Sequence, residues 1–113
     1  MQKKNNRLES NGQGNYFPEL SPDGQQIVFI TYTENPTRGM IYVMNADGSN
    51  LKQLTDGSAN DEHLTWLPDG KWIAFERDAW EEKGGRFEQT YWAICVMDVR
   101  GANVKILVEE QTK

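Results

Sequence analysis

The chain has 113 residues, a net charge of −5 and 37% hydrophobic residues, which suits one soluble domain and is too short for two independent ones. Its lysines and arginines are scattered, so no basic stripe is available for nucleic acid or an anionic membrane, and neither is expected as a partner. Cys95 is the one cysteine, which excludes an internal disulfide, and its apolar neighbours predict a buried side chain.

Residues 1–15 are predicted to form a polar N-terminal arm. Lys3 and Lys4 are not followed by an apolar run, so neither a signal peptide nor a membrane span is predicted. We therefore expect a cytoplasmic protein, or a periplasmic or secreted one if the sequence is part of a longer precursor. Leu8 lies 46 residues before Leu54, so residues 6–9 are either a remnant strand of a preceding repeat or part of a disordered arm.

Residues 16–60 are predicted to form four strands, at 16–20, 26–32, 40–45 and 50–55. Pro22-Asp23-Gly24 joins the first two; proline presets φ and glycine supplies a positive φ, as a tight hairpin turn requires. The run from Ile27 to Ile30 is apolar at consecutive positions. A strand of this kind has two apolar faces, so the sheet needs cover on both sides.

Residues 61–108 repeat this pattern. Pro68-Asp69-Gly70 follows the first such turn by 46 residues, whereas Lys105 and Leu107 follow Lys52 and Leu54 by 53. The second copy therefore carries a seven-residue insertion, within a predicted loop at 78–90. Its strands are predicted at 62–66, 72–77, 91–98 and 103–108, and residues 109–113 form a tail. No window has helical periodicity, so the chain is predicted to be all-β, with two four-stranded antiparallel meanders.

These motifs resemble the TolB-type, WD40-like β-propeller repeat. The first copy carries Ile41-Tyr42-Val43-Met44-Asn45-Ala46-Asp47-Gly48 and Leu54-Thr55, and the second carries Trp66, Pro68-Asp69-Gly70-Lys71 and Ile73-Ala74-Phe75. Leu67, the stretch 98–101 and Leu107-Val108 depart from the family pattern, which affects turn details more than the fold. The resemblance implies that each copy is one propeller blade.

Two blades cannot close a ring, because closed propellers use about 4–8. Their outer faces would then be exposed, so the chain is predicted to associate front to back with copies of itself. The family resemblance implies six blades, and therefore a homotrimer; a dimer and a tetramer are the alternatives. The competing interpretation is that the chain is a piece of a larger propeller.

His63 is the one candidate for a metal or substrate ligand. In the propeller that the resemblance implies, it begins the innermost strand of the second blade, where some lyase-like relatives place such a histidine. Repeated around an axis with Asp61 and Glu62, it would offer ligands for a divalent cation. The alternative is an exposed or hydrogen-bonded histidine, and no metal or other cofactor is predicted.

The insertion is the second candidate site. Trp80, Arg86 and Phe87 lie in it around Gly84-Gly85, which suits contact with a ligand or another protein, or else local packing of the two aromatic rings. No catalytic constellation is found. The sequence therefore predicts a non-catalytic binding or scaffold module that presents a loop-lined face to a protein or small ligand. The alternative is a propeller subunit or fragment of a hydrolase or lyase acting on a saccharide or peptide, with His63 in its channel.

Overall fold

A computed structural model describes residues 3–4, 7–8, 14–34, 36–101 and 103–111. It contains ten strands: β1 (Lys3–Lys4), β2 (Arg7–Leu8), β3 (Asn15–Leu20), β4 (Gln26–Tyr32), β5 (Gly39–Asn45), β6 (Lys52–Gln53), β7 (Asn60–Trp66), β8 (Trp72–Lys83), β9 (Arg86–Asp98) and β10 (Lys105–Gln111). Among these residues, no helix is long and apolar enough to cross a bilayer.

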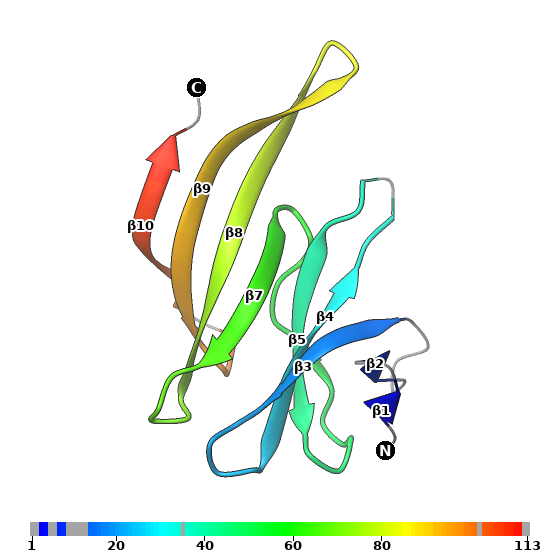
Figure 1. Ribbon diagram of the computed structural model, residues 1–113, viewed down its shortest axis with the longest axis vertical. Coiled ribbons are helices and arrows are strands. Elements are labelled where there is room, and N and C mark those ends of the chain that lie inside the picture. The colour runs from blue at the N-terminus through cyan, green and yellow to red at the C-terminus, as the bar shows by residue number, and fades with distance from the viewer. Residues whose placement is uncertain (1–2, 5–6, 9–13, 35, 102, 112–113) are drawn as a thin grey trace.

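The strands form two antiparallel sheets that follow chain order. One sheet has the order β1-β2-β3-β4-β5-β6 and the other has the order β10-β9-β8-β7 (Figure 1). The predicted all-β fold with two four-stranded meanders, β3–β6 and β7–β10, is confirmed, and we call these blade 1 and blade 2. Arg7 and Leu8 pair with Tyr16 and Asn15 of β3, so β2 extends the sheet of blade 1 and belongs to no separate sheet.

The predicted loop at 78–90 is wrong. β8 continues to Lys83 and β9 begins at Arg86, so the insertion prolongs two strands into a hairpin. The turn consists of Gly84 and Gly85, with φ of 58° and 82°. Two successive positive φ values suit a two-residue hairpin turn, which explains why the insertion continues the ladder.

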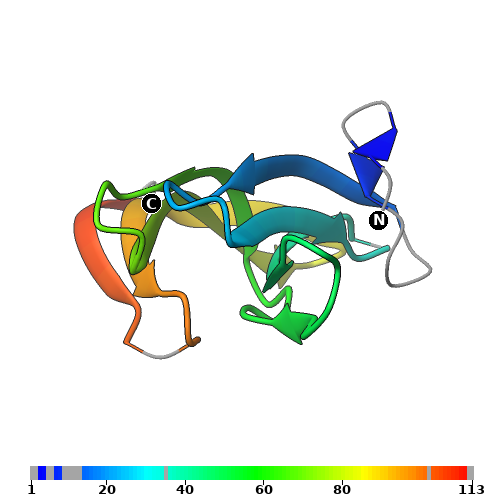
Figure 2. The ribbon, with the colours of Figure 1, turned by 90° about the horizontal axis from the view of Figure 1, so that it is seen from below.

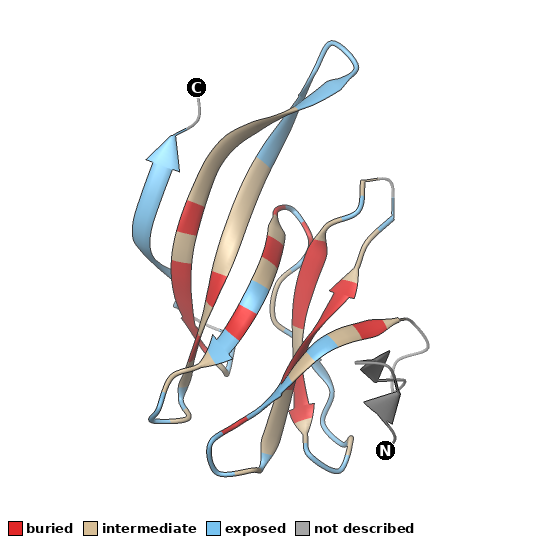
Figure 3. Ribbon diagram, viewed as in Figure 1, coloured by how far each residue is buried: buried red, intermediate tan, exposed pale blue. Residues whose placement is uncertain are grey.

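The fourth strands also differ from their predicted ranges. In blade 1 the strand comprises only Lys52–Gln53, after which the N–H groups of Leu54 and Thr55 donate to the Ile41 carbonyl of β5; in blade 2 the strand continues to Gln111, beyond the predicted end at 108. Figure 3 shows that β10 is exposed along its length. Blade 2 therefore ends in a long outer strand and blade 1 in a short one.

The main core lies between the blades. Successive side chains of a strand point to opposite faces, so alternate residues of β4 and β5 face blade 2. They pack against apolar side chains of β7, β8 and β9, and the buried cluster comprises Val28, Ile30, Ile41, Val43, Leu64, Ile73, Phe75, Ala93, Cys95 and Met97. The prediction that Cys95 is buried is confirmed.

The face of blade 1 that points away from blade 2 is not open. Phe29 and Met44 form a second cluster there with Ile27 and Tyr42, and neither Phe29 nor Met44 has any exposed surface. In Figures 1 and 2, β1 and β2 lie at this end of the molecule, opposite blade 2. The expectation of two bare outer faces is therefore wrong for blade 1.

The inner strands of the two blades correspond to each other. Phe17 and His63 lie 46 residues apart and both have left-handed backbones, with φ of 55° and 60°. Each sits in a register shift of its inner strand, between Tyr16 and Glu19 in β3 and between Glu62 and Thr65 in β7. Each inner strand therefore carries the same β-bulge.

Candidate functional site

Asp61 stabilises the interior of blade 2. Its carboxylate is 1% exposed and accepts two hydrogen bonds from Arg77, from Nε at 2.7 Å and from Nη2 at 3.0 Å. This pairing raises the pKa of Arg77 above its ordinary value, because the hydrogen bonds favour the charged guanidinium. In blade 1 the corresponding residues are Asn15 and Thr31, whose side chains are joined at 2.6 Å. Asp61 therefore belongs to a strand-to-strand link that both blades contain.

Glu62 connects the two blades. Its Oε2 accepts a hydrogen bond from the Tyr32 hydroxyl at 2.6 Å, and its Oε1 accepts one from Asn60 Nδ2 at 3.2 Å. Burial, and then the bond to Glu62, raise the pKa of Tyr32 above its ordinary value. Both oxygens of Glu62 are thus held in place before any ligand arrives.

His63 projects from the bulge of β7. Its side chain is 71% exposed, and Nδ1 lies 3.4 Å from Oε2 of Glu76. Within the described part of the chain, no three histidine, cysteine, aspartate or glutamate side chains are grouped so as to hold a metal ion. The structure therefore does not bring Asp61, Glu62 and His63 together as a ligand set within one chain: Asp61 turns into the blade, whereas His63 turns out to solvent.

A pocket of about 360 Å³ lies beside the two inner strands, lined by Phe17, Glu19, Glu62, His63 and Leu64. Phe17, which is 57% exposed, was not among the predicted site residues. The spacing of the repeat could have identified Phe17 as the equivalent of His63, because Phe17 precedes His63 by the same 46 residues that separate the Pro-Asp-Gly turns. The pocket combines an aromatic ring, an imidazole and two carboxylates, and none of these five residues has a hydroxyl or thiol nucleophile.

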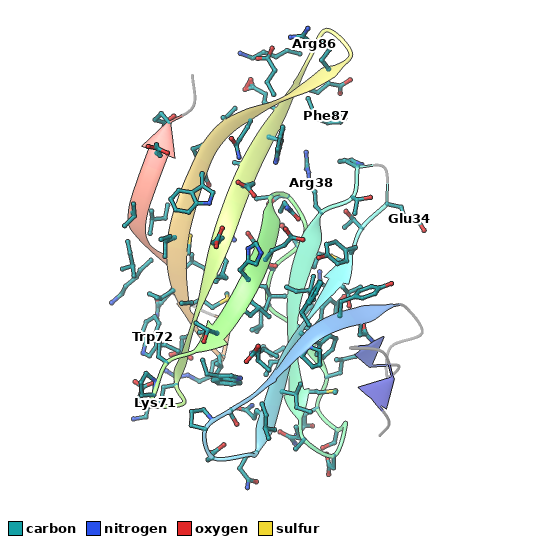
Figure 4. The ribbon with its side chains drawn as sticks, viewed as in Figure 1. Glu34, Arg38, Lys71, Trp72, Arg86 and Phe87 are labelled. Atoms are coloured by element: carbon teal, nitrogen blue, oxygen red, sulfur yellow. The ribbon has the colours of Figure 1, made fainter. Side chains whose placement is uncertain are left out.

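The hairpin places the remaining predicted residues elsewhere, because none of the described hairpin residues lines this pocket. Trp80 is 40% exposed and Phe87 is 49% exposed, while Arg86 donates to Glu88 at 3.2 Å. The Arg38 guanidinium lies 5.9 Å from the centre of the Phe87 ring, and Figure 4 shows both side chains at the hairpin end of the molecule. The hairpin of blade 2 therefore contacts the loop between β4 and β5 of blade 1, and its aromatic rings keep exposed surface.

No family model matches the chain. Dipeptidyl-peptidase 5 of Porphyromonas endodontalis is 37% identical over 60 residues, which cover 50% of this chain and 9% of that protein. The uncharacterized protein Atu1656 of Agrobacterium fabrum is 31% identical over 81 residues, which cover 63% of this chain and 27% of that protein. This chain therefore spans well under half the length of these relatives.

A solved structure is similar over most of the chain. The "putative TolB" of Agrobacterium tumefaciens superposes with a TM-score of 0.65 at 23% sequence identity, over 88% of this chain and 35% of that one. Together with the two four-stranded sheets, this likeness defines a TolB-like β-propeller fold.

Proposed function

We propose that the chain is a non-catalytic binding module built from two TolB-type repeats, which presents its inner-strand pocket and hairpin end to a protein or small ligand. The observation that supports this proposal most directly is the repeated bulge. Phe17 and His63 adopt φ of 55° and 60°, which costs a residue with a side chain about 1–2 kcal/mol. Such strain persists where the surrounding structure imposes it, and it clusters at binding sites.

The pocket's chemistry suggests the class of ligand. The exposed ring of Phe17 offers an apolar surface with a negative face, and Glu19 and Glu62 add carboxylates close to it. A ligand with an apolar part and a positive charge, such as a basic peptide segment, suits this combination. The hydrogen bond from Tyr32 holds the Glu62 carboxylate in one position, which reduces the ordering cost on binding.

The second candidate is a piece of a hydrolase or lyase, which the partial likeness to dipeptidyl-peptidase 5 supports. In that case His63 would contact a substrate or metal. Against it, the pocket residues include no hydroxyl or thiol nucleophile, and the described partner of the imidazole is the single carboxylate of Glu76. The binding module is therefore the better supported of the two.

The test uses a displayed library of random peptides selected on the immobilised protein, after which individual peptides are synthesised and titrated. Peptides enriched in basic and apolar residues should bind about tenfold more weakly to Phe17→Asn and Glu62→Gln, because each variant removes one kind of pocket contact. Leu20→Asn is the matched control, since Leu20 is an apolar residue of β3 that is 58% exposed but lies outside both the pocket and the hairpin. Peptide binding that depends on Leu20 and is indifferent to Phe17 would contradict the pocket proposal.

A second measurement separates the two candidates. Zinc and manganese salts alone are titrated calorimetrically into the wild type and into His63→Ala, and both proteins are assayed on chromogenic dipeptidyl anilides and on polygalacturonate. We expect no turnover and no metal binding that depends on His63. Turnover or metal binding that disappears in His63→Ala would support the enzyme fragment instead.

A further inference from the structure

At the outer end of the interface between the blades, a turn of blade 2 lies on two side chains of blade 1. Lys52 Nζ of β6 donates a hydrogen bond to the Arg100 carbonyl, in the turn between β9 and β10. A Cβ on Gly101 of that turn would lie 3.3 Å from Leu54 Cδ2 and 3.6 Å from Lys52 Cε. The turn of blade 2 therefore covers Lys52 and Leu54 of blade 1 closely, and the φ of 87° at this position favours glycine.

Blade 2 presents the same two residue types at the corresponding positions, and among the described residues no turn lies on them. Lys105 and Leu107 follow Lys52 and Leu54 by 53 residues. Leu54 is half-buried against the main core, whereas Leu107 is 60% exposed and the adjacent Val108 is 51% exposed. The outer edge of blade 2 thus repeats the seat for a turn: Leu107 is exposed to solvent, and the Lys105 ammonium lies 5.1 Å from the centre of the Trp72 ring.

The turn that fits this seat exists on blade 1, between β5 and β6. Gly48 has φ of 91° and Gly101 has φ of 87°. The Gly48 N–H donates to the Asn45 carbonyl at 2.8 Å, as the Gly101 N–H does to the Asp98 carbonyl at 2.9 Å. The two turns therefore share one backbone conformation. Where blade 2 has Arg100, however, blade 1 has the exposed Asp47.

We propose that the turn 45–49 of a second copy of this chain occupies the seat formed by Lys105 and Leu107. Gly48 of the second copy would rest on the two side chains as Gly101 rests on Lys52 and Leu54. The carboxylate of Asp47 would face the ammonium of Lys105, which gives the contact opposite charges. The contact joins different surfaces of the two copies, so it is heterologous and closes into a ring where the rotation permits.

The inner half of the joint differs from the contact within the chain. Gly39 lies so close to β7 that a Cβ there would be 2.3 Å from the Asp61 carbonyl oxygen. Blade 2 has Trp92 at the corresponding position, and its Nε1 donates to Glu76 at 3.2 Å. Two copies are therefore held further apart near the inner strands, and the outer seat makes the contact. The contact between copies does not depend on which ligand the pocket binds.

The test is the mass of the whole chain in solution, by sedimentation and light scattering at about 50 μM. The wild type should have a mass that is a multiple of 13.0 kDa. Lys105→Glu should weaken association about tenfold or more, because a second carboxylate would then face Asp47. Asp47→Arg should do the same, although it also removes the two hydrogen bonds that Asp47 Oδ1 accepts from Ser49. The double variant restores opposite charges and should regain the wild-type mass.

Lys83→Glu is the matched control, because it makes the same change of charge at an exposed lysine on the hairpin tip. It should leave the mass unchanged. Circular dichroism of each variant checks that the fold is retained, and if Asp47→Arg fails to fold, the comparison of Lys105→Glu with Lys83→Glu still decides.

Mixing the two single variants reports the ring size. In an alternating ring every joint pairs opposite charges: either the introduced glutamate meets the introduced arginine, or the unchanged Lys105 meets the unchanged Asp47. An even ring can alternate completely, whereas in a trimer one joint must pair two identical copies. A dimer or tetramer should therefore be restored by mixing, and a trimer should not.

Three results would overturn the proposal. A wild-type mass of 13.0 kDa would leave the seat to a different blade or protein. Equal effects of Lys105→Glu and Lys83→Glu would mean that net charge, and not the seat, controls association. A folded double variant that stays dissociated would show that positions 47 and 105 do not meet.

Discussion

Blade 1 and blade 2 have the same backbone plan, but their side chains satisfy it by different chemistry. The buried link between the first two strands is neutral in blade 1, from Thr31 to Asn15, and ionic in blade 2, from Arg77 to Asp61. The bulge presents Phe17 in one blade and His63 in the other. Corresponding positions therefore have the same backbone conformation and different side-chain chemistry, which indicates that the repeat specifies the geometry of the backbone while each blade adapts to its own neighbours.

The outer edges show the same contrast. β6 consists of Lys52 and Gln53, a short polar edge that discourages pairing with other chains, whereas β10 has seven exposed residues that include Ile106, Leu107 and Val108. Of these two described outer strands, β10 is the longer, and it carries three exposed apolar residues. This asymmetry is what a head-to-tail contact between copies would use.

The largest predicted effect breaks the ionic link of blade 2. Asp61→Ala leaves the partly buried Arg77 without its carboxylate and should lower the free energy of unfolding by about 3–5 kcal/mol. Asn15→Ala breaks the neutral link of blade 1 and should cost about 1–3 kcal/mol. Urea unfolding monitored by tryptophan fluorescence measures both.

A transplanted pair sharpens this comparison. Asp61→Asn combined with Arg77→Thr puts the residues of blade 1 into blade 2, and the double variant should be more stable than Asp61→Ala because no unpaired charge remains. If Asp61→Ala and Asn15→Ala cost the same, the ionic character of the blade 2 link has no energetic consequence.

The next effect concerns the close approach of the blades. Gly39→Ala places a Cβ 2.3 Å from the Asp61 carbonyl oxygen, so the backbone must move, at a cost of about 3 kcal/mol. Gly84→Ala is the control: nothing lies within 4 Å of its Cβ, and only its φ of 58° is unfavourable, which costs about 1 kcal/mol. Thermal unfolding of the two variants gives the comparison, and a smaller shift for Gly39→Ala would contradict it.

A smaller effect, with a pH signature, concerns the bond from Tyr32 to Glu62. Tyr32→Phe should cost about 1 kcal/mol at neutral pH. Because the pKa of Tyr32 is raised in the folded protein from an ordinary value of 10.0, its contribution is fully present below pH 10 and is lost as the pH rises further. Urea unfolding at a series of alkaline pH values should show a shallower loss of stability in Tyr32→Phe. Identical slopes would mean that the hydrogen bond does not persist in solution.

The smallest predicted effect is a difference between the two blades in how their turns respond to acid. The hydrogen bonds from Arg100 lower the pKa of Asp98 from 3.8 to about 2, so its contribution is present above pH 3.8 and is lost as the pH falls toward 2. Blade 1 has Asn45 at this position, which does not titrate. Asp98→Asn should therefore reduce the dependence of stability on pH in this range, measured by acid titration of circular dichroism. Asn45→Asp should not restore it, because Asp47 takes the place of the arginine in that turn.

The repeat in the sequence was sufficient to predict the fold but only part of the candidate site. The Pro-Asp-Gly turns and the doubly apolar runs predicted two meanders with a shared core, because these features depend on local backbone preference and on strand period. The spacing of the turns also indicates that Phe17 and His63 occupy equivalent positions in the two blades. The bulge itself was not predicted, because a register shift depends on how one strand meets the next.

The insertion shows where local reasoning fails. Its charged residues and two glycines predict a loop, yet Gly84 and Gly85 supply the turn of a hairpin and the flanking residues pair, with one register shift between Ala79 and Trp80. Pairing with a strand that is already in place stabilises residues that have no strand pattern of their own.

The sequence by itself therefore determined the all-β class, the two four-stranded units and the burial of Cys95, because turn residues and apolar strands act locally. Only the tertiary structure decided that Asp61 turns inward to Arg77, that Glu62 binds Tyr32 and that His63 faces solvent. It also decided that Phe29 and Met44 are covered while Leu107 is exposed. These outcomes depend on which strands become neighbours, and neighbours that are distant in the chain are determined by packing between the blades and not by the pattern within either one.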